Sequence, residues 1–412
     1  MNEQKKPRVL FVNGYIYVPG EGGYKRTLYL FNMMKSMGYE CTLLTSDFNH
    51  YAKKKRNTEE FYKKYPDFKD IVMLSMNAYE KNISIKRWWA GYSWSKRVKL
   101  WFEQNWRKYD VVYMHMPDAN SILNIKPICD AHKIKMAVDV RDLRPEGLRV
   151  VFKKEWLYNM LTFPMKKKAD KAYACADQMI AVSNEYLQRG MSVNNKSKDP
   201  VAVFIGAIFD KFYSGIEKNA SKIDKREEDI WVTYAGTLGS TYDLYTMLDA
   251  AKVLQDEGKK EIVFKILGQG PEAESLKQYT AERGLNNVDF VGFVDYEMMA
   301  AYLSKSDMTV NSVKRRASQS IINKVADYFA AGIPCLNGSI CKEMQDLITD
   351  WKAGINYEPE DVNSFVNAIK TIIENPEMAA EFGANAKRLA AEKFDRSISY
   401  KEIIRRLDNL VK

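Results

Sequence analysis

The chain has 412 residues, of which 46% are hydrophobic and 28% are charged. This length exceeds the roughly 250–300 residues at which a single core stops growing, so two domains are expected, and the apolar content excludes a disordered chain. The net charge of +10 is uneven: residues 1–190 contain 34 Lys and Arg against 20 Asp and Glu, and residues 191–412 contain 29 against 33. The first half is therefore expected to face something anionic, such as nucleic acid, a membrane surface or phosphorylated substrates.

The sequence favours a cytoplasmic protein. No window approaches the roughly 18 uninterrupted apolar residues of a membrane span, and the first residues lack the apolar stretch of a secretory signal. The five cysteines are scattered and form no CxxC pair. They are expected to be reduced thiols, neither a disulfide framework nor a zinc site.

Apolar strands alternate with helical stretches along the first half. The pattern predicts one helix over 24–37 and strands over 8–14, 41–46, 110–116, 135–140 and 178–183. Alternation of this kind favours a parallel sheet with helices on both faces.

A second series of the same kind follows a polar stretch. It predicts helices over 244–257 and about 320–331, and strands over 230–236, 261–268, 288–293, 307–312 and 333–336. The fold class is therefore α/β, with two tandem Rossmann-like, doubly wound domains over 1–188 and 189–388. The final helix, within 389–412, places Tyr400, Ile403, Ile404, Leu407 and Val411 on one face and is free to pack on its own domain or on the first.

Ligands of parallel α/β sheets bind beyond the carboxyl ends of the strands. After the first strand, Gly20, Gly22 and Gly23 precede a helix, and Arg26 lies in its first turns. Glycines let the backbone approach a ligand, a helix start favours anions, and Arg26 is within reach of a phosphate there. The alternative is a flexible surface loop.

Three segments of the second half have the features of a nucleotide site. Gly236 and Gly239 bracket one strand–helix turn, and Gly268 and Gly270 form another. The helix starting near residue 320 carries Lys324 and, three residues on, Asp327, which share a face and suit a diphosphate and a ribose. The alternatives are ordinary tight turns and an exposed Lys–Asp pair of little energetic weight.

These motifs resemble family 4 retaining glycosyltransferases, which have the GT-B fold, and most of all the subgroup that builds bacterial surface polysaccharides. The resemblance covers nearly the whole chain. It is carried by the GGxxR loop (Gly22, Gly23 and Arg26), VDVRDLRPE (138–146), DQMIAVS (177–183), AGTLGSTYDL (235–244) and NKVADYFAAGIP (323–334).

The resemblance implies a nucleotide-sugar donor, by family habit a UDP-sugar, bound in a cleft between the two domains, and no cofactor. It would place the diphosphate against Thr237, Leu238 and Gly239, and the nucleoside near Gly268 and Gly270. Asn323, Lys324 and Val325 would meet the phosphates, and Asp327 the ribose. Departures are Gln319 in place of the family's first acid, Thr237 and Tyr242 in place of a basic pair, and Arg144 in place of a Trp.

Sugar transfer passes through an oxocarbenium-like transition state, and negative charge develops on the departing diphosphate. No Asp-x-Asp occurs in the chain, so a metal-independent hexosyltransferase is expected. Lys324 would stabilise the leaving group, while His115 and Asp142 follow strands of the first domain and could act on the acceptor side. The alternatives are a structural histidine and a salt bridge from Asp142 to Arg141 or Arg144.

Residues 85–109 contain five Trp, two Tyr and seven Lys or Arg, and two further basic clusters occupy 52–56 and 165–171. Such residues favour a bilayer interface, which predicts peripheral docking on an anionic membrane and suits a polyprenyl-diphosphate-linked acceptor. The alternative is a solvated basic face over buried Trp. Competing functions are an epimerase or phosphorylase of the same fold, a basic nucleic-acid-binding protein, and an inactive transferase remnant; no nucleic-acid motif supports the second.

Overall fold

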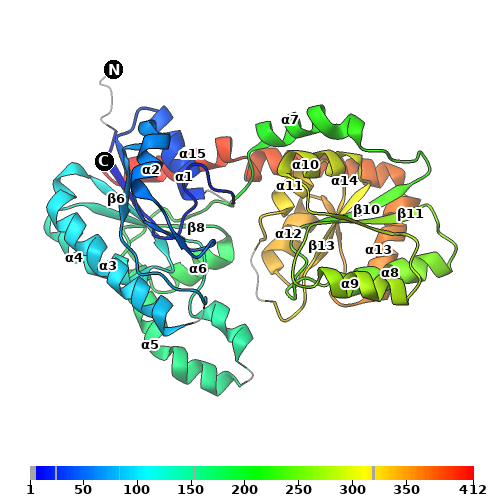
Figure 1. Ribbon diagram of the computed structural model, residues 1–412, viewed down its shortest axis with the longest axis horizontal. Helices are drawn as coiled ribbons and strands as arrows, with labels where there is room; N and C mark the ends of the chain where they lie inside the picture. Colours follow the sequence, from blue (N-terminus) through cyan, green and yellow to red (C-terminus); the bar gives the residue numbers. More distant parts are fainter. Residues whose placement is uncertain (1–5, 24–25, 83, 153, 318–320) are drawn as a thin grey trace. The chain divides into compact units, whose positions relative to one another are not determined.

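The computed structural model describes residues 6–23, 26–82, 84–152, 154–317 and 321–412 and divides into two α/β units (Figure 1). The first unit runs to Val203 and resumes at Tyr400; the second is Phe204–Ser399. The sequence placed the change at 188/189. The structure places it after Val203, because the short strand β9 (Val201–Ala202) still pairs with the first sheet.

The first sheet has seven parallel strands in the order β5-β2-β1-β6-β7-β8-β9. Most are short apolar runs whose side chains are buried on both faces, as in a sheet covered by helices on each side. Beside β9, the strands are β1 (Val9–Val12), β2 (Cys41–Ser46), β5 (Ile71–Leu74), β6 (Val111–Met116), β7 (Lys135–Val140) and β8 (Gln178–Ala181), and a separate hairpin joins β3 (Phe48–Asn49) to β4 (Lys54–Lys55).

Two helical layers cover this sheet. One core contains residues of α3, α4 and α5, and the opposite core contains residues of α1 and α15. The helices of the unit are α1 (Arg26–Ser36), α2 (Thr58–Lys64), α3 (Ile85–Asn105), α4 (Ala119–Ala131), α5 (Glu155–Ala174), α6 (Asn184–Met191) and, from Tyr400 on, α15 (Arg396–Asn409). Tyr400, Ile403, Ile404 and Leu407 are buried, whereas Val411, expected on the same face, is 40% exposed beyond the end of the helix.

The second sheet has six parallel strands in the order β12-β11-β10-β13-β14-β15. These are β10 (Ile230–Ala235), β11 (Ile262–Leu267), β12 (Val288–Gly292), β13 (Met308–Ser312), β14 (Cys335–Gly338) and β15 (Gly354–Asn356). One core packs α8 and α13 on the sheet, and the other packs α7, α10, α11, α12 and α14. The helices are α7 (Phe209–Asn219), α8 (Leu244–Asp256), α9 (Ala273–Glu282), α10 (Tyr296–Lys305), α11 (Val325–Ala330), α12 (Lys342–Asp350), α13 (Val362–Glu374) and α14 (Pro376–Leu389).

The two tandem Rossmann-like units expected of the GT-B fold are therefore present. In each sheet the first strand in sequence lies inside, and later strands extend to either side of it, which is the doubly wound order. The helix expected over about 320–331 begins only at Val325, and Ile321–Lys324 form a turn before it. Cys41, Cys129, Cys335 and Cys341 are buried free thiols, and Cys175 is a half-buried one.

Candidate active site

The turns that follow β10 and β11 lie directly against each other. The amide of Gly236 donates to Leu267 O over 2.9 Å, and the amide of Leu238 donates to Gln269 O over 3.1 Å. Gly268 has a φ of +138°, and a Cβ there would stand 1.8 Å from the carbonyl oxygen of Gly236. Only glycine fits this position, because a side chain would clash with backbone as well as require a strained conformation.

The packing of these two turns determines which of the predicted donor-site residues a ligand can reach. Gly270 is closed in, because a Cβ there would lie 2.2 Å from Leu238 O. Leu238 is buried in the core, and its amide is already bonded, so the expectation that it lines a diphosphate is not met. Thr237 is exposed, and Gly236 and Gly239 are half-buried, so these three remain on the accessible side of the turn.

Lys324 reaches this turn from the start of α11. Its Nζ lies 3.8 Å from the ring centroid of Tyr234 and 3.9 Å from that of Tyr242. The side chain is buried, and Nζ has no hydrogen-bond partner among the residues that the structure describes. Burial lowers the pKa of Lys324 well below its usual value, since charge is costly away from water. The amine thus lacks a counter-charge beside Gly236, where a Cβ would stand 3.0 Å from it.

Asp327, on the next turn, faces a different neighbour. Its Oδ1 accepts a 2.7 Å hydrogen bond from the hydroxyl of Tyr296, the first residue of α10. Burial raises the pKa of this carboxyl to about 7, although the Tyr296 bond and Arg396 oppose the rise. Both side chains are buried, and no ion pair joins Lys324 and Asp327 in the part of the chain that the structure describes, so the exposed-pair alternative is wrong.

The remaining residues of this segment have mixed positions. Val325 is buried in the core, and its amide donates to Ile322 O over 3.3 Å, so it does not present that amide to a ligand. Asn323 is half-buried at the turn. Gln319 lies outside the described residues. No sequence pattern pointed to Tyr328. Its hydroxyl accepts from the amide of Ala235 and donates to the carbonyl of the same residue, both at 2.9 Å, and so joins α11 to the end of β10.

In the first unit, Arg26 is not a phosphate ligand. It is 1% exposed, and its Nε lies 2.9 Å from Asp139 Oδ2. Its Nη1 donates to Val203 O over 2.9 Å, and the guanidinium stacks 5.0 Å from the ring of Tyr400. This prediction is corrected: Arg26 is an internal ion-pair residue. Gly22 and Gly23 are exposed, and a Cβ on Gly23 would strike the ring of Tyr17.

His115 and Asp142 agree with their structural alternatives. His115 lies within β6 and is buried, with its Nδ1 3.3 Å from Val12 O. Burial, together with Arg141, lowers the pKa of its imidazole to about 4, so the ring is neutral near pH 7. Asp142 is half-exposed and pairs with Arg144 at 3.3 Å. Neither carries a catalytic assignment here.

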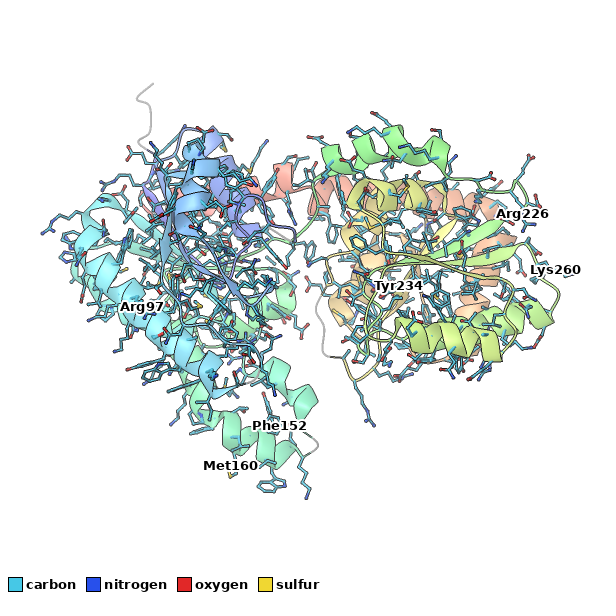
Figure 2. The ribbon with its side chains drawn as sticks, in the orientation of Figure 1. Arg97, Phe152, Met160, Arg226, Tyr234 and Lys260 are labelled. Carbon is cyan, nitrogen blue, oxygen red and sulfur yellow. The ribbon has the colours of Figure 1, made fainter. Side chains whose placement is uncertain are left out.

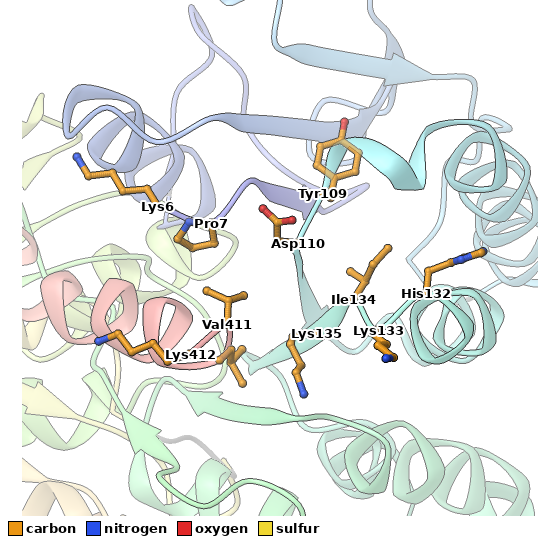
Figure 3. A pocket seen from close by; sticks show the side chains of 11 residues that line it. Lys6, Pro7, Tyr109, Asp110, His132, Lys133, Ile134, Lys135, Val411 and Lys412 are labelled. Atoms are coloured by element: carbon orange, nitrogen blue, oxygen red, sulfur yellow. The ribbon is translucent and has the colours of Figure 1, made fainter. Parts of the chain in front are cut away.

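A groove of about 540 Å³ lies at the amino ends of the strands of the first sheet, the end opposite to the one where ligands of such sheets bind (Figure 3). It is lined by Lys6, Pro7, Tyr109, Asp110, His132, Lys133, Ile134, Lys135, Leu410, Val411 and Lys412. Parallel α/β sheets bind ligands at the carboxyl ends of their strands, so this groove is not the candidate site. Among the described residues, no group of three or more His, Cys, Asp and Glu side chains could hold a metal ion.

Comparison with known proteins shows that these turns lie in a segment similar to a known family. The model of the glycosyl transferases group 1 matches residues 215–389. The matched segment is less than half of the chain and lies within the second unit. It contains Gly236, Lys324 and Asp327, whereas His115 and Asp142 lie outside it.

Two curated relatives match about half of the chain. The putative colanic acid biosynthesis glycosyl transferase WcaI of Escherichia coli K12 is 22% identical over 232 residues, which is 56% of this chain and 54% of that protein. An uncharacterized glycosyltransferase of Methanocaldococcus jannaschii, MJ1069, is 25% identical over 246 residues, or 59% and 60% of the two chains. The match thus spans little more than half of each relative.

Solved structures share the fold over nearly the whole chain. Anabaena Alr3699/HepE in complex with UDP has a TM-score of 0.69 at 14% identity and covers 98% of this chain and 100% of its own. WaaG, a glycosyltransferase involved in lipopolysaccharide biosynthesis, has a TM-score of 0.59 at 12% identity and covers 96% and 98%. At these identities the likeness concerns the fold.

Proposed function

We propose that the protein is a metal-independent retaining glycosyltransferase that moves a sugar from a UDP-sugar to a polyprenyl-diphosphate-linked saccharide during surface polysaccharide synthesis. The observation that carries the proposal is the unpaired, buried amine of Lys324 beside the Gly236 turn of the matched segment. The relatives named for sugar transfer support it, and so do HepE complexes with UDP and with UDP-glucose.

The proposed reaction uses few protein groups. When the donor binds, the diphosphate charge favours the ammonium form of Lys324, which takes its proton from solvent and offsets the lowering of its pKa by burial. As the bond between the sugar and the diphosphate breaks, negative charge grows on the departing phosphate, and this ammonium stabilises it. The leaving phosphate accepts the proton of the acceptor hydroxyl. The exposed Thr237 and the accessible Gly236 and Gly239 would contact the diphosphate. Asp327, fixed by Tyr296, would accept a hydrogen bond from a ribose hydroxyl.

A thermal-shift titration with UDP, GDP and ADP tests the donor site. UDP is expected to raise the melting temperature in a concentration-dependent way, since a ligand at 100 times its Kd stabilises a folded protein by about 2.7 kcal/mol. ADP at the same concentrations serves as the matched control. Salt-sensitive binding of DNA together with no shift for any nucleotide would instead support a nucleic-acid-binding protein.

The finer proposal is that the first unit docks on an anionic membrane through α3 and α5. No described helix is long and apolar enough to cross a bilayer. Of the five Trp predicted to face lipid, Trp94 is fully buried, and Trp101 and Trp106 pack on the core, but Trp88 and Trp89 are 63% and 52% exposed.

Helix α5 repeats the pattern of α3. Trp156, Met160 and Phe163 are all more than half exposed, and Met160 points away from the molecule (Figure 2). Their spacing of three and four residues puts them on one face, and Lys167 continues it, 4.6 Å above the Phe163 ring. On α3, Nζ of Lys96 likewise lies over the ring of Tyr92, 5.4 Å from its centroid. Apolar and aromatic faces that end in lysines suit the boundary between acyl chains and anionic headgroups.

Vesicle sedimentation tests this surface. Replacing Trp156, Met160 and Phe163 together with Ser is expected to lower binding to vesicles containing anionic phosphatidylglycerol by at least about ten-fold, because the inserted apolar area is lost. Phe293→Ser is the matched control, since Phe293 is an exposed apolar residue, 70% accessible, in the second unit. Equal binding of the triple variant and the wild type would overturn the docking surface.

A further inference from the structure

A cluster of basic and aromatic side chains surrounds Tyr79 in the first unit. The Tyr79 hydroxyl bonds Nδ1 of His50, and the ring has Lys53 Nζ at 5.0 Å and the Arg87 guanidinium at 6.0 Å from its centroid. The ring of Tyr15 packs edge-on against His50, with centroids 5.4 Å apart. We call His50, Lys53, Tyr79, Arg87 and Arg144 the Tyr79 cluster.

The cluster is assembled from segments at one edge of the first sheet. His50 and Lys53 lie in the turn of the β3–β4 hairpin, which comes after β2, and Tyr79 follows β5. Arg87 lies in the first turn of α3, and Arg144 follows β7. In a parallel sheet the carboxyl ends of the strands share an edge, and that edge is where α/β folds bind ligands. The cluster therefore has the position of a ligand site, although the sequence patterns gave no reason to connect these segments.

Positive charge in the cluster is only partly neutralised. Arg144 pairs with Asp142, but neither Lys53 nor Arg87 forms an ion pair within the described ranges. Both are instead bonded to Asn82, Lys53 to its side-chain oxygen and Arg87 to its carbonyl. Burial lowers the pKa of Arg87, and the charge of Arg144 lowers it further.

The imidazole of His50 is neutral near pH 7. Burial lowers the pKa of its imidazole to about 4, and the charges of Lys53, Arg87 and Arg144 act in the same direction. The cluster thus holds three cations around a neutral, half-buried centre with one nearby carboxylate. An anion with several oxygens would relieve this repulsion, and a guanidinium matches phosphate oxygens in geometry.

We propose that the Tyr79 cluster binds the diphosphate of a lipid-linked saccharide acceptor. Arg87 lies between Ile85 and Trp88, and both of these side chains are exposed on the helix face that we assign to the membrane. A phosphate bound by Arg87 would thus lie at headgroup depth, with its lipid chain directed toward the bilayer. The inference rests on the proposed function for the identity of the acceptor, but it concerns a different unit and different residues from the donor site.

The test is a binding titration with farnesyl diphosphate as the probe, and with farnesol and inorganic pyrophosphate as separate arms. The full-length protein is expected to bind farnesyl diphosphate, and Lys53→Gln and Arg87→Gln are each expected to weaken binding by about ten-fold or more because a charged partner is lost. Lys99→Gln is the matched control: it removes a positive charge from the same helix, where Lys99 pairs with Glu103 at 3.0 Å on the surface.

The arms separate the outcomes. Weakening by both variants but not by Lys99→Gln supports the site, and weaker binding of farnesol and of pyrophosphate supports a lipid-linked diphosphate. Equal binding by all proteins, or binding of pyrophosphate as tight as that of farnesyl diphosphate, overturns it. UDP binding, measured in parallel, reports the donor site. If neither the wild type nor any variant binds UDP, the proposed function is contradicted, but the farnesyl diphosphate result can still be interpreted.

Discussion

Lys324→Ala is expected to lower kcat for sugar transfer by about 10²–10³-fold, the usual effect of removing one group that stabilises developing negative charge. The amine lies beside the Gly236 turn between the rings of Tyr234 and Tyr242, and within the described ranges no hydrogen bond engages it. UDP binding should weaken as well, because the ground-state diphosphate carries charge. Steady-state transfer kinetics and a UDP titration on the same preparations would measure both effects.

The melting temperature separates this role from a structural one. An unpaired buried amine destabilises the folded state, so Lys324→Ala should melt no lower than the wild type. Lys342→Ala, at an exposed position in the same unit, is the matched control and should leave turnover unchanged. Wild-type turnover and UDP affinity in Lys324→Ala would refute the assigned donor site.

Arg26→Ala is expected to destabilise the first unit by about 3–5 kcal/mol, because it leaves the Asp139 carboxylate buried without its counter-charge. Both side chains have no exposure. Burial alone would raise the pKa of Asp139, but the charge and hydrogen bonds of Arg26 lower it below the usual value. Urea denaturation, followed by the fluorescence of the first unit's Trp residues, would measure the loss.

A second ion pair provides the control. Arg8 and Asp110 are 2.8 Å apart, but each is about one-third exposed, so Arg8→Ala should cost no more than about 1 kcal/mol. Combining Arg26→Met with Asp139→Leu should restore part of the stability, since no buried charge is left unpaired. If Arg26→Ala unfolds at the same urea concentration as Arg8→Ala, the ion pair does not contribute as inferred.

The sequence predicted the sheets well because most of their strands are uninterrupted apolar runs. All ten expected strands are present; they are β1, β2, β6, β7, β8, β10, β11, β12, β13 and β14. It missed the two-residue strands β3 and β4 of the separate hairpin. It also missed β5, a four-residue run next to charged segments, and the two- and three-residue strands β9 and β15; these three lie at sheet edges. Short edge strands form because a neighbour offers hydrogen bonds, and that neighbour is not visible in their own sequence.

Site prediction succeeded where glycine spacing dictates backbone geometry. The turns at Gly236 and Gly268 were found because only glycine tolerates such close approach. It failed at Arg26, whose partner Asp139 is 113 residues away in the chain. Nothing near an arginine in sequence tells a buried ion pair from a free phosphate ligand. The Tyr79 cluster was missed for the same reason, since its members come from three separate loops and a helix start.

The return of α15 to the first unit makes the second unit an insertion within it. Val203 and Tyr400, where the chain leaves and re-enters, both contact Arg26, through a carbonyl oxygen and an aromatic ring. Truncation at Val203 would remove the buried residues Tyr400 and Ile403 and bare the apolar surface they cover. The amino-terminal half should therefore be produced by splicing Val203 to Tyr400 through a short linker, whereas Phe204–Ser399 can be excised as one continuous piece.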